Sequence, residues 1–384
     1  MHIIHQGFDG FDITVATNIS SKLARELEIA KDQAAKSNSP KLVTINSLKY
    51  HVADHGLRGG YAYSLDSGLL GYKLWVKKPN PNDIYGIGVS FAALPLAIYG
   101  LEHCYNKILE DLSVIGCKVT PMEVLVRRID YAIDLKIENF FLEPMFFVHH
   151  SRIKRDQNTE IRETSCAGRV IYCRVGKIPN KQITIYDKRK DILDKNKPEW
   201  WKIWNTNLEK QNLPKITKEN SKDMIWRFEL RLGKEALRKF NIKLVEDFFE
   251  RGGSAFINLA DTVRYTAPTG LDKKRNRWPD SPEWIFIRQK LSHGLKEMAG
   301  SLDEQSILKI KRDAHQKMLL SQIAGTGLSY LNSINKLPDD AAQLCPRKLS
   351  EILSAELSSH YQENRLRLPK KVQEIRDKQN FLVD

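Results

Sequence analysis

Two short segments of alternating charged and apolar residues constrain the fold of this sequence most strongly. One runs from Arg128 to Asp134 and the other from Trp226 to Leu232. Successive side chains of a β-strand point to opposite faces, so each segment predicts a strand with one charged and one apolar face. The charged face of the first carries the carboxylates Asp130 and Asp134, and that of the second carries Glu229.

Arginines share these charged faces: Arg128 on the first strand, and Arg227 and Arg231 on the second. A third segment, Gln182–Arg189, predicts a strand on which Tyr186 faces away from its apolar isoleucines. Taken alone, each segment is typical of an ordinary amphipathic strand with its charged face in water. If all three belong to one sheet, carboxylates, arginines and a phenol converge on one surface.

Such a surface suits phosphoryl transfer. Mg²⁺ or Mn²⁺ prefers carboxylate oxygens and polarises a phosphodiester, while Arg or Lys balances the charge that develops on phosphate. Tyrosine, with a reference pKa of about 10, is a weak nucleophile until it is activated. Its phosphodiester ester conserves bond energy, so a cleaved strand can later be rejoined.

The charge of the whole chain points to a polyanionic partner. The 384 residues carry 61 Lys and Arg against 47 Asp and Glu, a formal net charge of +14. No membrane-length apolar run and no secretory signal is present, so we expect a cytoplasmic protein that binds nucleic acid rather than membrane. With 41% hydrophobic residues the composition is globular, which excludes a largely disordered chain.

The order of patterns predicts an α+β fold, an antiparallel sheet with packed helices followed by a mostly helical domain. We expect a catalytic domain over residues 1–255 and a C-terminal domain over residues 256–384 that binds DNA or oligomerises. The ranges expected as strands are 11–15, several hairpins within 42–91, 124–135, 169–176, 182–187 and 226–232. Helices are expected over 94–115, 140–150, 284–298 and 303–323, with an exposed loop over 152–164.

Four motifs occur in an order that resembles a known family. They are RIDYAID from residue 128, GRVIYCRVG from residue 168, QITIYDK from residue 182 and WRFELRLGK from residue 226. Together they resemble the Rep_trans replication initiation proteins, which are initiators of rolling-circle plasmids, related phage proteins and relaxases of some integrative elements. The resemblance covers roughly residues 55 to 290.

Membership of this family would imply a site-specific, metal-dependent DNA nickase. Such an enzyme bonds the 5′ phosphate to a tyrosine and exposes a 3′-hydroxyl for a polymerase. By position, Tyr186 matches the nucleophile, Asp130 and Glu229 match the residues that hold Mg²⁺ or Mn²⁺, and Asp134 is a third candidate ligand. We add Lys188 and Arg227 as catalytic residues on grounds of charge alone.

The sequence departs from the wider HUH nickases, whose metal site uses two histidines in a His-hydrophobic-His triplet. No such triplet occurs, and the clustered pairs, His51 with His55 and His149 with His150, have the wrong spacing. We therefore expect an HUH-like core without the HUH histidines, in which carboxylates hold the metal.

Basic residues near the three predicted strands and in a later basic run are candidates for DNA contact. They are Arg128, Lys177, Lys181, Arg189, Lys190, Arg231, Lys273, Lys274, Arg275 and Arg277. Nearby Trp200, Trp201 and Trp204 are candidates for stacking on unpaired bases. The alternative is that the basic residues lie in solvated loops and that the tryptophans are part of the core.

These patterns predict a rolling-circle replication initiator that nicks and later rejoins one strand of origin DNA. The alternatives are a conjugative relaxase with the same chemistry, an origin-binding regulator that has lost cleavage, and an RNA-binding protein. Termination would require a second nucleophile, either Tyr172 in the preceding strand or the tyrosine of a second subunit. By family analogy we expect a homodimer, and a helicase is a further candidate partner.

Overall fold

The computed structural model describes residues 1–149, 161–220, 222, 224–270, 272–300, 302–334 and 350–381, apart from 352, 353, 355, 356, 359 and 363. The chain divides into two compact units, Met1–Glu304 and Gln305–Asp384. The first unit contains both sheets and all of the predicted site residues.

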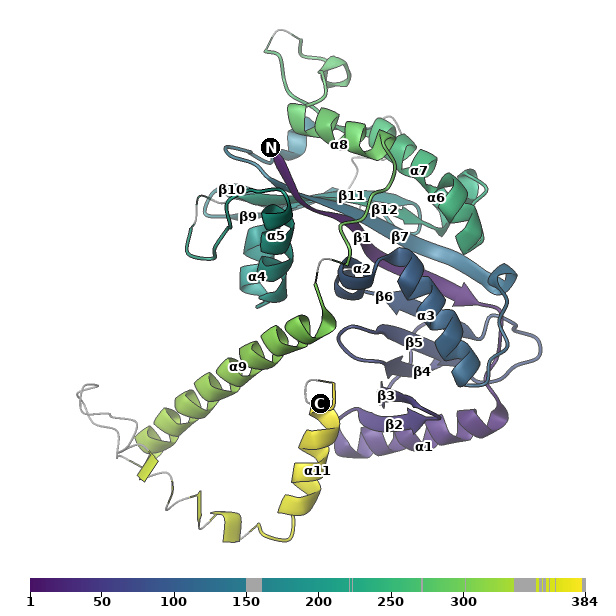
Figure 1. Ribbon diagram of the computed structural model, residues 1–384, viewed down its shortest axis with the longest axis vertical. Helices are drawn as coiled ribbons and strands as arrows, with labels where there is room; N and C mark the ends of the chain where they lie inside the picture. The colour runs from purple at the N-terminus through teal and green to yellow at the C-terminus, as the bar shows by residue number, and fades with distance from the viewer. Residues whose placement is uncertain are drawn as a thin grey trace. The chain divides into compact units, whose positions relative to one another are not determined.

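An antiparallel sheet of eleven strands is the centre of the first unit (Figure 1). From one edge to the other its strands are β2 (Lys41–Ile45), β3 (Leu48–Val52), β4 (Tyr61–Asp66), β5 (Tyr72–Lys77), β6 (Ile87–Phe91), β1 (His2–Val15), β7 (Val124–Lys136), β12 (Ile225–Gly233), β11 (Lys181–Asp187), β10 (Arg169–Gly176) and β9 (Ile161–Cys166). A second, two-stranded sheet pairs β8 (Phe147–His149) with β13 (Val263–Tyr265). The expected α+β fold with an antiparallel sheet is confirmed.

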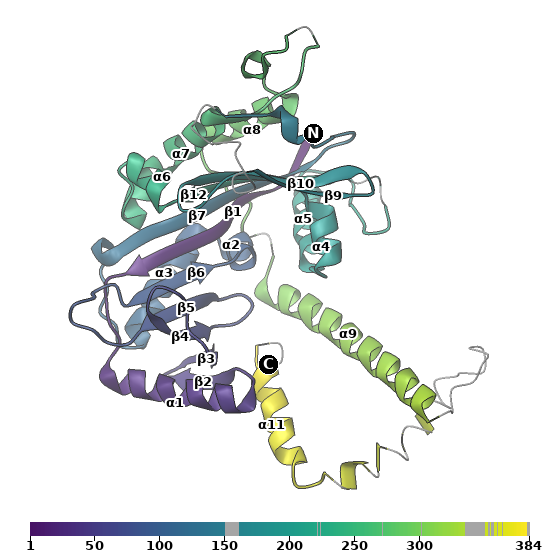
Figure 2. The ribbon, with the colours of Figure 1, turned by 180° about the vertical axis from the view of Figure 1, so that it is seen from behind.

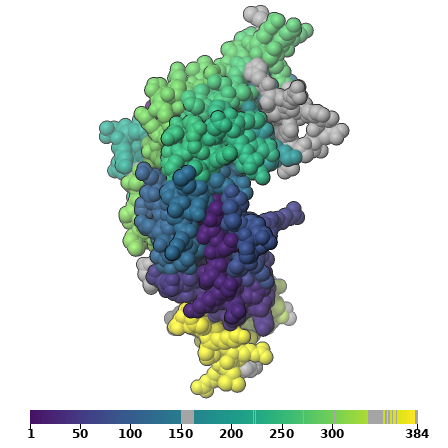
Figure 3. Space-filling view, turned by 90° about the vertical axis from the view of Figure 1, so that its right-hand side faces the viewer, coloured from purple at the N-terminus to yellow at the C-terminus, as the bar shows by residue number. Residues whose placement is uncertain are grey.

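One face of the large sheet is apolar and carries the main core. Alternate residues of neighbouring strands, such as Phe11, Ile129 and Phe228, are buried together there. The helices that cover this face are α1 (Ser21–Ser37), α2 (Ala93–Tyr99), α3 (Leu101–Val114), α6 (Lys234–Lys239), α7 (Val245–Thr262) and α8 (Pro282–Ser292). In the space-filling view, the green of α6 and α7, the blue of α3 and the purple of α1 follow one another down this side (Figure 3).

The opposite face is polar and has a smaller cover. Helices α4 (Lys188–Asp194) and α5 (Glu199–Lys210) lie on the side of the sheet away from α6, α7 and α8, as both ribbon views show (Figure 2). Helix α5 contacts β1, and α4 contacts β12. These two helices therefore lie next to the three predicted charged strands.

Several expected elements differ in extent. The helix expected over 94–115 is broken into α2 and α3 at Gly100, whose φ of 83° is one that L side chains rarely adopt. The helix expected over 140–150 was wrong: within the described residues, 144–146 form a 3₁₀ turn (Pro144–Phe146) and 147–149 form β8. Of the loop expected over 152–164, residues 161–164 belong to β9, and the rest lies outside the described residues.

The end of the first unit also differs from the sequence-based boundary. Residue 255 falls within α7, and the compact unit continues to Glu304. Helix α7 belongs to the apolar-face core through Phe248 and Phe256, so the first unit does not end there.

Two further 3₁₀ turns lie at Pro121–Glu123 and Arg275–Arg277.

The second unit is helical in its described part. It contains α9 (Glu304–Ser333), which begins at the last residue of the first unit, and α11 (Leu368–Gln379). Among the described residues, no helix is both long enough and apolar enough to cross a membrane.

Candidate active site

Strand pairing brings the predicted charged residues together on the polar face of the sheet. Strand β12 lies between β7 and β11, and its Arg227 is directly opposite Asp134 on one side and Tyr186 on the other. Two residues further along β12, Glu229 faces the same side of the sheet. The three segments are thus neighbouring strands of one sheet, which is the condition on which the predicted convergence depended.

The centre of this face is a buried ion pair between Arg227 and Asp134, whose side chains are both 0% exposed. The Nε of Arg227 donates to Asp134 Oδ1 at 2.6 Å, and its Nη2 donates to Oδ2 at 2.8 Å. The same Oδ2 accepts a third hydrogen bond, from Trp204 Nε1, at 2.8 Å. Asp134 is thus fully engaged by protein donors.

A residue not predicted from the sequence, Asp9, completes the coordination of Arg227. Its Oδ1 accepts a hydrogen bond from Nη1 of Arg227. Asp9 lies on β1 where the register with β7 shifts between Phe8 and Gly10, so it does not follow the regular alternation of the strand. The aspartates and glycines around Asp9 are typical of a turn rather than a strand, so the sequence did not place this residue on the sheet.

A second charge cluster lies beside the first. Arg128 donates to both oxygens of Asp130, with Nε at 2.9 Å and 3.1 Å, and Arg231 donates from Nε to Glu229 Oε1 at 2.5 Å. Arg231 Nε also lies 3.4 Å from Asp130 Oδ2, so it bridges the two carboxylates. A Cβ on Gly10 would lie 2.7 Å from Asp130 Oδ2, so only glycine leaves room there for this carboxylate.

The carboxyls of this cluster are protonated more readily than usual. Burial raises the pKa of Glu229 to about 7, helped by the negative charges of Asp9 and Asp130. Burial also raises the pKa of Asp130, although Arg128 and Arg231 oppose the shift. The pKa of Asp134 is instead lowered, because the charge of Arg227 and its hydrogen bonds outweigh burial.

In the described part of the chain, no three His, Cys, Asp or Glu side chains are arranged to hold a metal ion. The reason is that arginines lie between the carboxylates and form ion pairs with their oxygens. Asp130 and Glu229, two of the expected ligands, are joined through Arg231, whereas Asp134, the third, is engaged by Arg227 and Trp204. Asp9 is a further carboxyl of this site, and its negative charge helps to raise the pKa of both Asp130 and Glu229.

Tyr186 and Lys188 lie next to each other at the end of β11. The Nζ of Lys188 is 3.4 Å from the phenol oxygen of Tyr186 and 3.2 Å from Asp191 Oδ2. Burial raises the pKa of Tyr186 well above its usual value, and the nearby charge of Arg227 only partly offsets this. Burial, together with the charge of Arg227, lowers the pKa of Lys188 to about 8.

The tryptophans of α5 cover this site on the polar face of the sheet. Trp200 is 2% exposed and lies over two cations, with its ring centroid 4.4 Å from the Arg227 guanidinium carbon and 4.8 Å from Lys188 Nζ. Trp204 is 0% exposed. Of the two alternatives for the tryptophans, the structure supports the core for Trp200 and Trp204, because their rings are buried. Trp201 is half-buried, and its ring centroid is 6.0 Å from the Arg189 guanidinium carbon.

The candidate DNA-contact residues near the site divide between the two faces of the sheet. Arg128 and Arg231 lie on the polar face, with side chains 31% and 28% exposed. Lys181 lies on the other face, where its Nζ donates to Thr262 Oγ1 of α7 at 2.5 Å. Three further candidates are solvent-accessible, in the β10–β11 turn and on α4: Lys177, Arg189 and Lys190.

The second basic run lies elsewhere in the first unit, beside the small sheet. Arg275 donates to the backbone oxygens of Met145 and Phe147, next to β8. Arg277 lies 3.6 Å from Asp272. Lys273 and Lys274 are exposed. This run is therefore separate from the charge clusters on the polar face.

Comparison with known proteins gives a remote similarity to a solved structure. No protein-family model matches this sequence, and no curated protein matches it. Among solved structures, the chain is similar to a rolling circle replication initiator protein from Geobacillus stearothermophilus, at 13% sequence identity and a TM-score of 0.41. That similarity covers 78% of this chain and 99% of the other.

Proposed function

We propose that this protein is a rolling-circle replication initiator that nicks one strand of origin DNA through Tyr186. The observation that carries the proposal is the position of Tyr186 on the polar face, beside Lys188 and across β12 from the carboxyls. The order of the motifs in the sequence supports an initiator in particular. The conjugative relaxase would use the same site.

The environment of Tyr186 supports a nucleophile that is activated on demand. Its raised pKa keeps the phenol protonated, so attack requires a base within reach. Lys188, with a pKa lowered to about 8 and its Nζ 3.4 Å from the phenol oxygen, is partly neutral near neutral pH. Lys188 therefore meets both requirements of a general base, distance and pKa.

In the proposed step, Lys188 Nζ accepts the phenol proton while Tyr186 Oη forms a bond to phosphorus. The bond from phosphorus to the 3′ oxygen breaks, and that oxygen leaves as a 3′-hydroxyl after taking a proton from solvent. The 5′ end stays on the protein as a phosphotyrosine. Arg227 is held by Asp9 and Asp134, so it stabilises the developing phenolate through its charge.

We propose that Mg²⁺ or Mn²⁺ binds to Asp130 and Glu229, with Asp9 as the third ligand in place of Asp134. The chemistry of these three carboxyls fits a hard cation, because their mutual repulsion contributes to the raised pKa of Glu229 and a cation would relieve it. Arg231 is 28% exposed and must release them first. When bound, the cation would polarise the scissile phosphate.

The test is a denaturing-gel assay with labelled DNA strands that tile the region around the gene, with Mg²⁺ or Mn²⁺ present. We expect a denaturation-resistant adduct with the wild-type protein and none with Tyr186→Phe. The matched control is Tyr172→Phe, since Tyr172 pairs directly with Tyr186 and their ring centroids are 6.2 Å apart. The first nick should survive in this control.

The proposal fails if cleavage occurs without an adduct, since that result means hydrolysis. A Tyr172→Phe protein that nicks but does not rejoin strands would identify Tyr172 as the second nucleophile. If the Tyr172→Phe protein still rejoins strands normally, Tyr172 is not the second nucleophile, and the tyrosine of a partner subunit is expected to supply it.

One observation favours the non-catalytic alternative, an origin-binding regulator. Arginines contact each of Asp130, Asp134 and Glu229, as expected for a face held together by ion pairs alone. Specific binding of one tiled strand, with neither adduct nor cleavage in the presence of metal, would support this function.

A further inference from the structure

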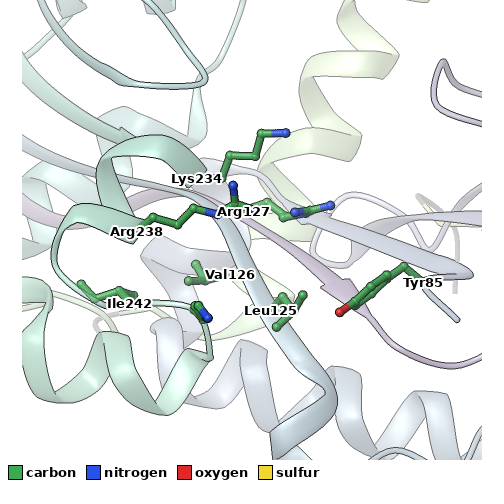
Figure 4. Close-up of a pocket in the computed structure, with 8 residues that line it drawn as sticks. Tyr85, Leu125, Val126, Arg127, Lys234, Arg238 and Ile242 are labelled. Carbon is green, nitrogen blue, oxygen red and sulfur yellow. The ribbon is translucent and has the colours of Figure 1, made fainter.

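A basic pocket lies where β12 ends and α6 begins, beside the first residues of β7. Its volume is about 400 Å³. Four of its lining residues are cations, Arg127, Lys234, Arg238 and Lys243, and the others are Tyr85, Leu125, Val126 and Ile242. Figure 4 shows Arg127, Lys234 and Arg238 close together, with Tyr85 toward the far end. No sequence motif pointed to this set.

The four cations are not neutralised by close ion pairs, although the charge of Lys243 helps to lower the pKa of Asp247 nearby. None of them forms an ion pair within 4.0 Å among the described residues, and the lining contains no carboxylate. Like charges gathered in this way repel one another, so the pocket gains stability from a bound anion. Four cations around one pocket also match several phosphates rather than one.

The pocket connects to the charge clusters of the candidate active site through β7. Arg127 Nε donates to Thr14 Oγ1 at 2.9 Å, and Thr14 lies on the same face of β1 as Asp12. Asp12 in turn contacts Arg128, the partner of Asp130. Along β7, Arg127 and Asp130 are three residues, or about 10 Å, apart.

We infer that this pocket binds consecutive phosphates of the single nucleic-acid strand that also crosses the active site. Tyr85 is 38% exposed and offers an aromatic face on which an unpaired base can stack. Asp134 is level with Tyr186 across the sheet, and Arg127 lies seven residues, or about 23 Å, from Asp134 along β7. A strand is favoured over a free nucleotide because only a strand of several nucleotides spans this distance. The inference rests on the proposed function only in placing the strand at Tyr186.

The test measures how strand affinity depends on salt in a variant that lacks two of these cations. Lys234→Ala/Arg238→Ala removes two exposed side chains of α6, and a labelled single strand of mixed sequence reports binding by fluorescence anisotropy. Each lost phosphate contact reduces the salt slope by about 0.7 for a single strand. The loss of affinity between 50 and 200 mM salt should thus be about sevenfold smaller than in the wild type.

Two controls separate this effect from net charge and from folding. Lys22→Ala/Lys36→Ala removes the same charge from the exposed face of α1 and should keep the wild-type slope. Lys234→Arg/Arg238→Lys keeps the charges in the pocket and should also keep the slope. A slope in the pocket variant equal to that of the α1 variant would overturn the inference.

Titration with pyrophosphate and ATP separates the two sources of phosphate. If either binds the wild type and not the pocket variant, while strand binding is unchanged, the ligand is a free phosphate compound and the inference is wrong. Adduct formation is read separately: an altered slope without an adduct refutes the nickase and keeps the pocket. An adduct with an unchanged slope refutes the pocket as a strand-binding site and keeps the nickase.

Discussion

Replacing Asp134 by asparagine should destabilise the protein by about 3 kcal/mol, because it breaks a buried ion pair. Both partners, Asp134 and Arg227, have side chains that are 0% exposed. The asparagine has nearly the same shape, but it presents an amide nitrogen to a guanidinium and cannot accept all three hydrogen bonds. Removing one partner leaves the guanidinium buried without its strongest counter-charge.

The magnitude follows from what remains around Arg227. Breaking a buried ion pair costs about 3–5 kcal/mol in general. Asp9 continues to accept from Nη1 of Arg227, so the loss belongs at the lower end of that range. An exposed ion pair gives the comparison: Lys190 and Asp194 have side chains 35% and 57% exposed, so Asp194→Asn should change the stability little.

The assay is urea unfolding followed by far-ultraviolet circular dichroism, in a buffer with chelator, for the wild type, Asp134→Asn and Asp194→Asn. We expect a clearly lower midpoint for Asp134→Asn and little change for Asp194→Asn. A metal ligand behaves in the opposite way, since loss of one of several crowded carboxylates relieves repulsion in metal-free protein. A midpoint for Asp134→Asn at or above the wild-type value would therefore refute the ion-pair role of Asp134.

Three further predictions concern other residues of the site. His5 of β1 is buried against Trp200, with ring centroids 5.2 Å apart, and burial lowers its pKa to about 4, so stability should fall by up to about 3 kcal/mol as pH drops from about 6.5 to about 4. Urea midpoints measured against pH should show this slope flattened in His5→Gln but kept in a variant of exposed His293. Lys188→Arg cannot lose its proton, so adduct formation should slow by about 10²-fold or more, and its rise with pH through about 8 should disappear; an unchanged profile would exclude Lys188 as base. At pH 8 the Glu229 carboxyl is ionised, since its pKa is about 7, so Mg²⁺ or Mn²⁺ should raise the melting temperature of the wild type and not of Glu229→Gln. An equal rise in both proteins would mean that Glu229 holds no metal.

The sequence was most informative where strands alternate regularly. In segments 128–134, 182–187 and 226–232 the period of two identifies both the strand and its polar face, because neighbouring side chains of a strand point in opposite directions. The apolar half of each segment also predicted its share of the core. These local patterns carried the expected convergence of Tyr186, Asp130 and Glu229 on one surface.

The pattern failed where the chain leaves this regular geometry. Strand β1 extends from His2 to Val15, yet only residues 11–15 were expected as a strand. Its register shifts relative to β7 and its glycines interrupt the alternation that identifies a strand from sequence. Asp9, at one of these shifts, was missed for this reason.

What the sequence determines by itself is the type of each regular element and the chemistry of its exposed side, because both depend on neighbouring residues. Which carboxylate serves which partner depends on strand order and register, set by packing between segments far apart in the chain. The tertiary structure alone assigns Asp134 to Arg227 and Trp204, and buries Trp200 over Arg227 and Lys188. It also brings the cations of β7, α6 and the following loop to one pocket. No local pattern encodes these contacts, since their free energies arise only after the sheet has formed.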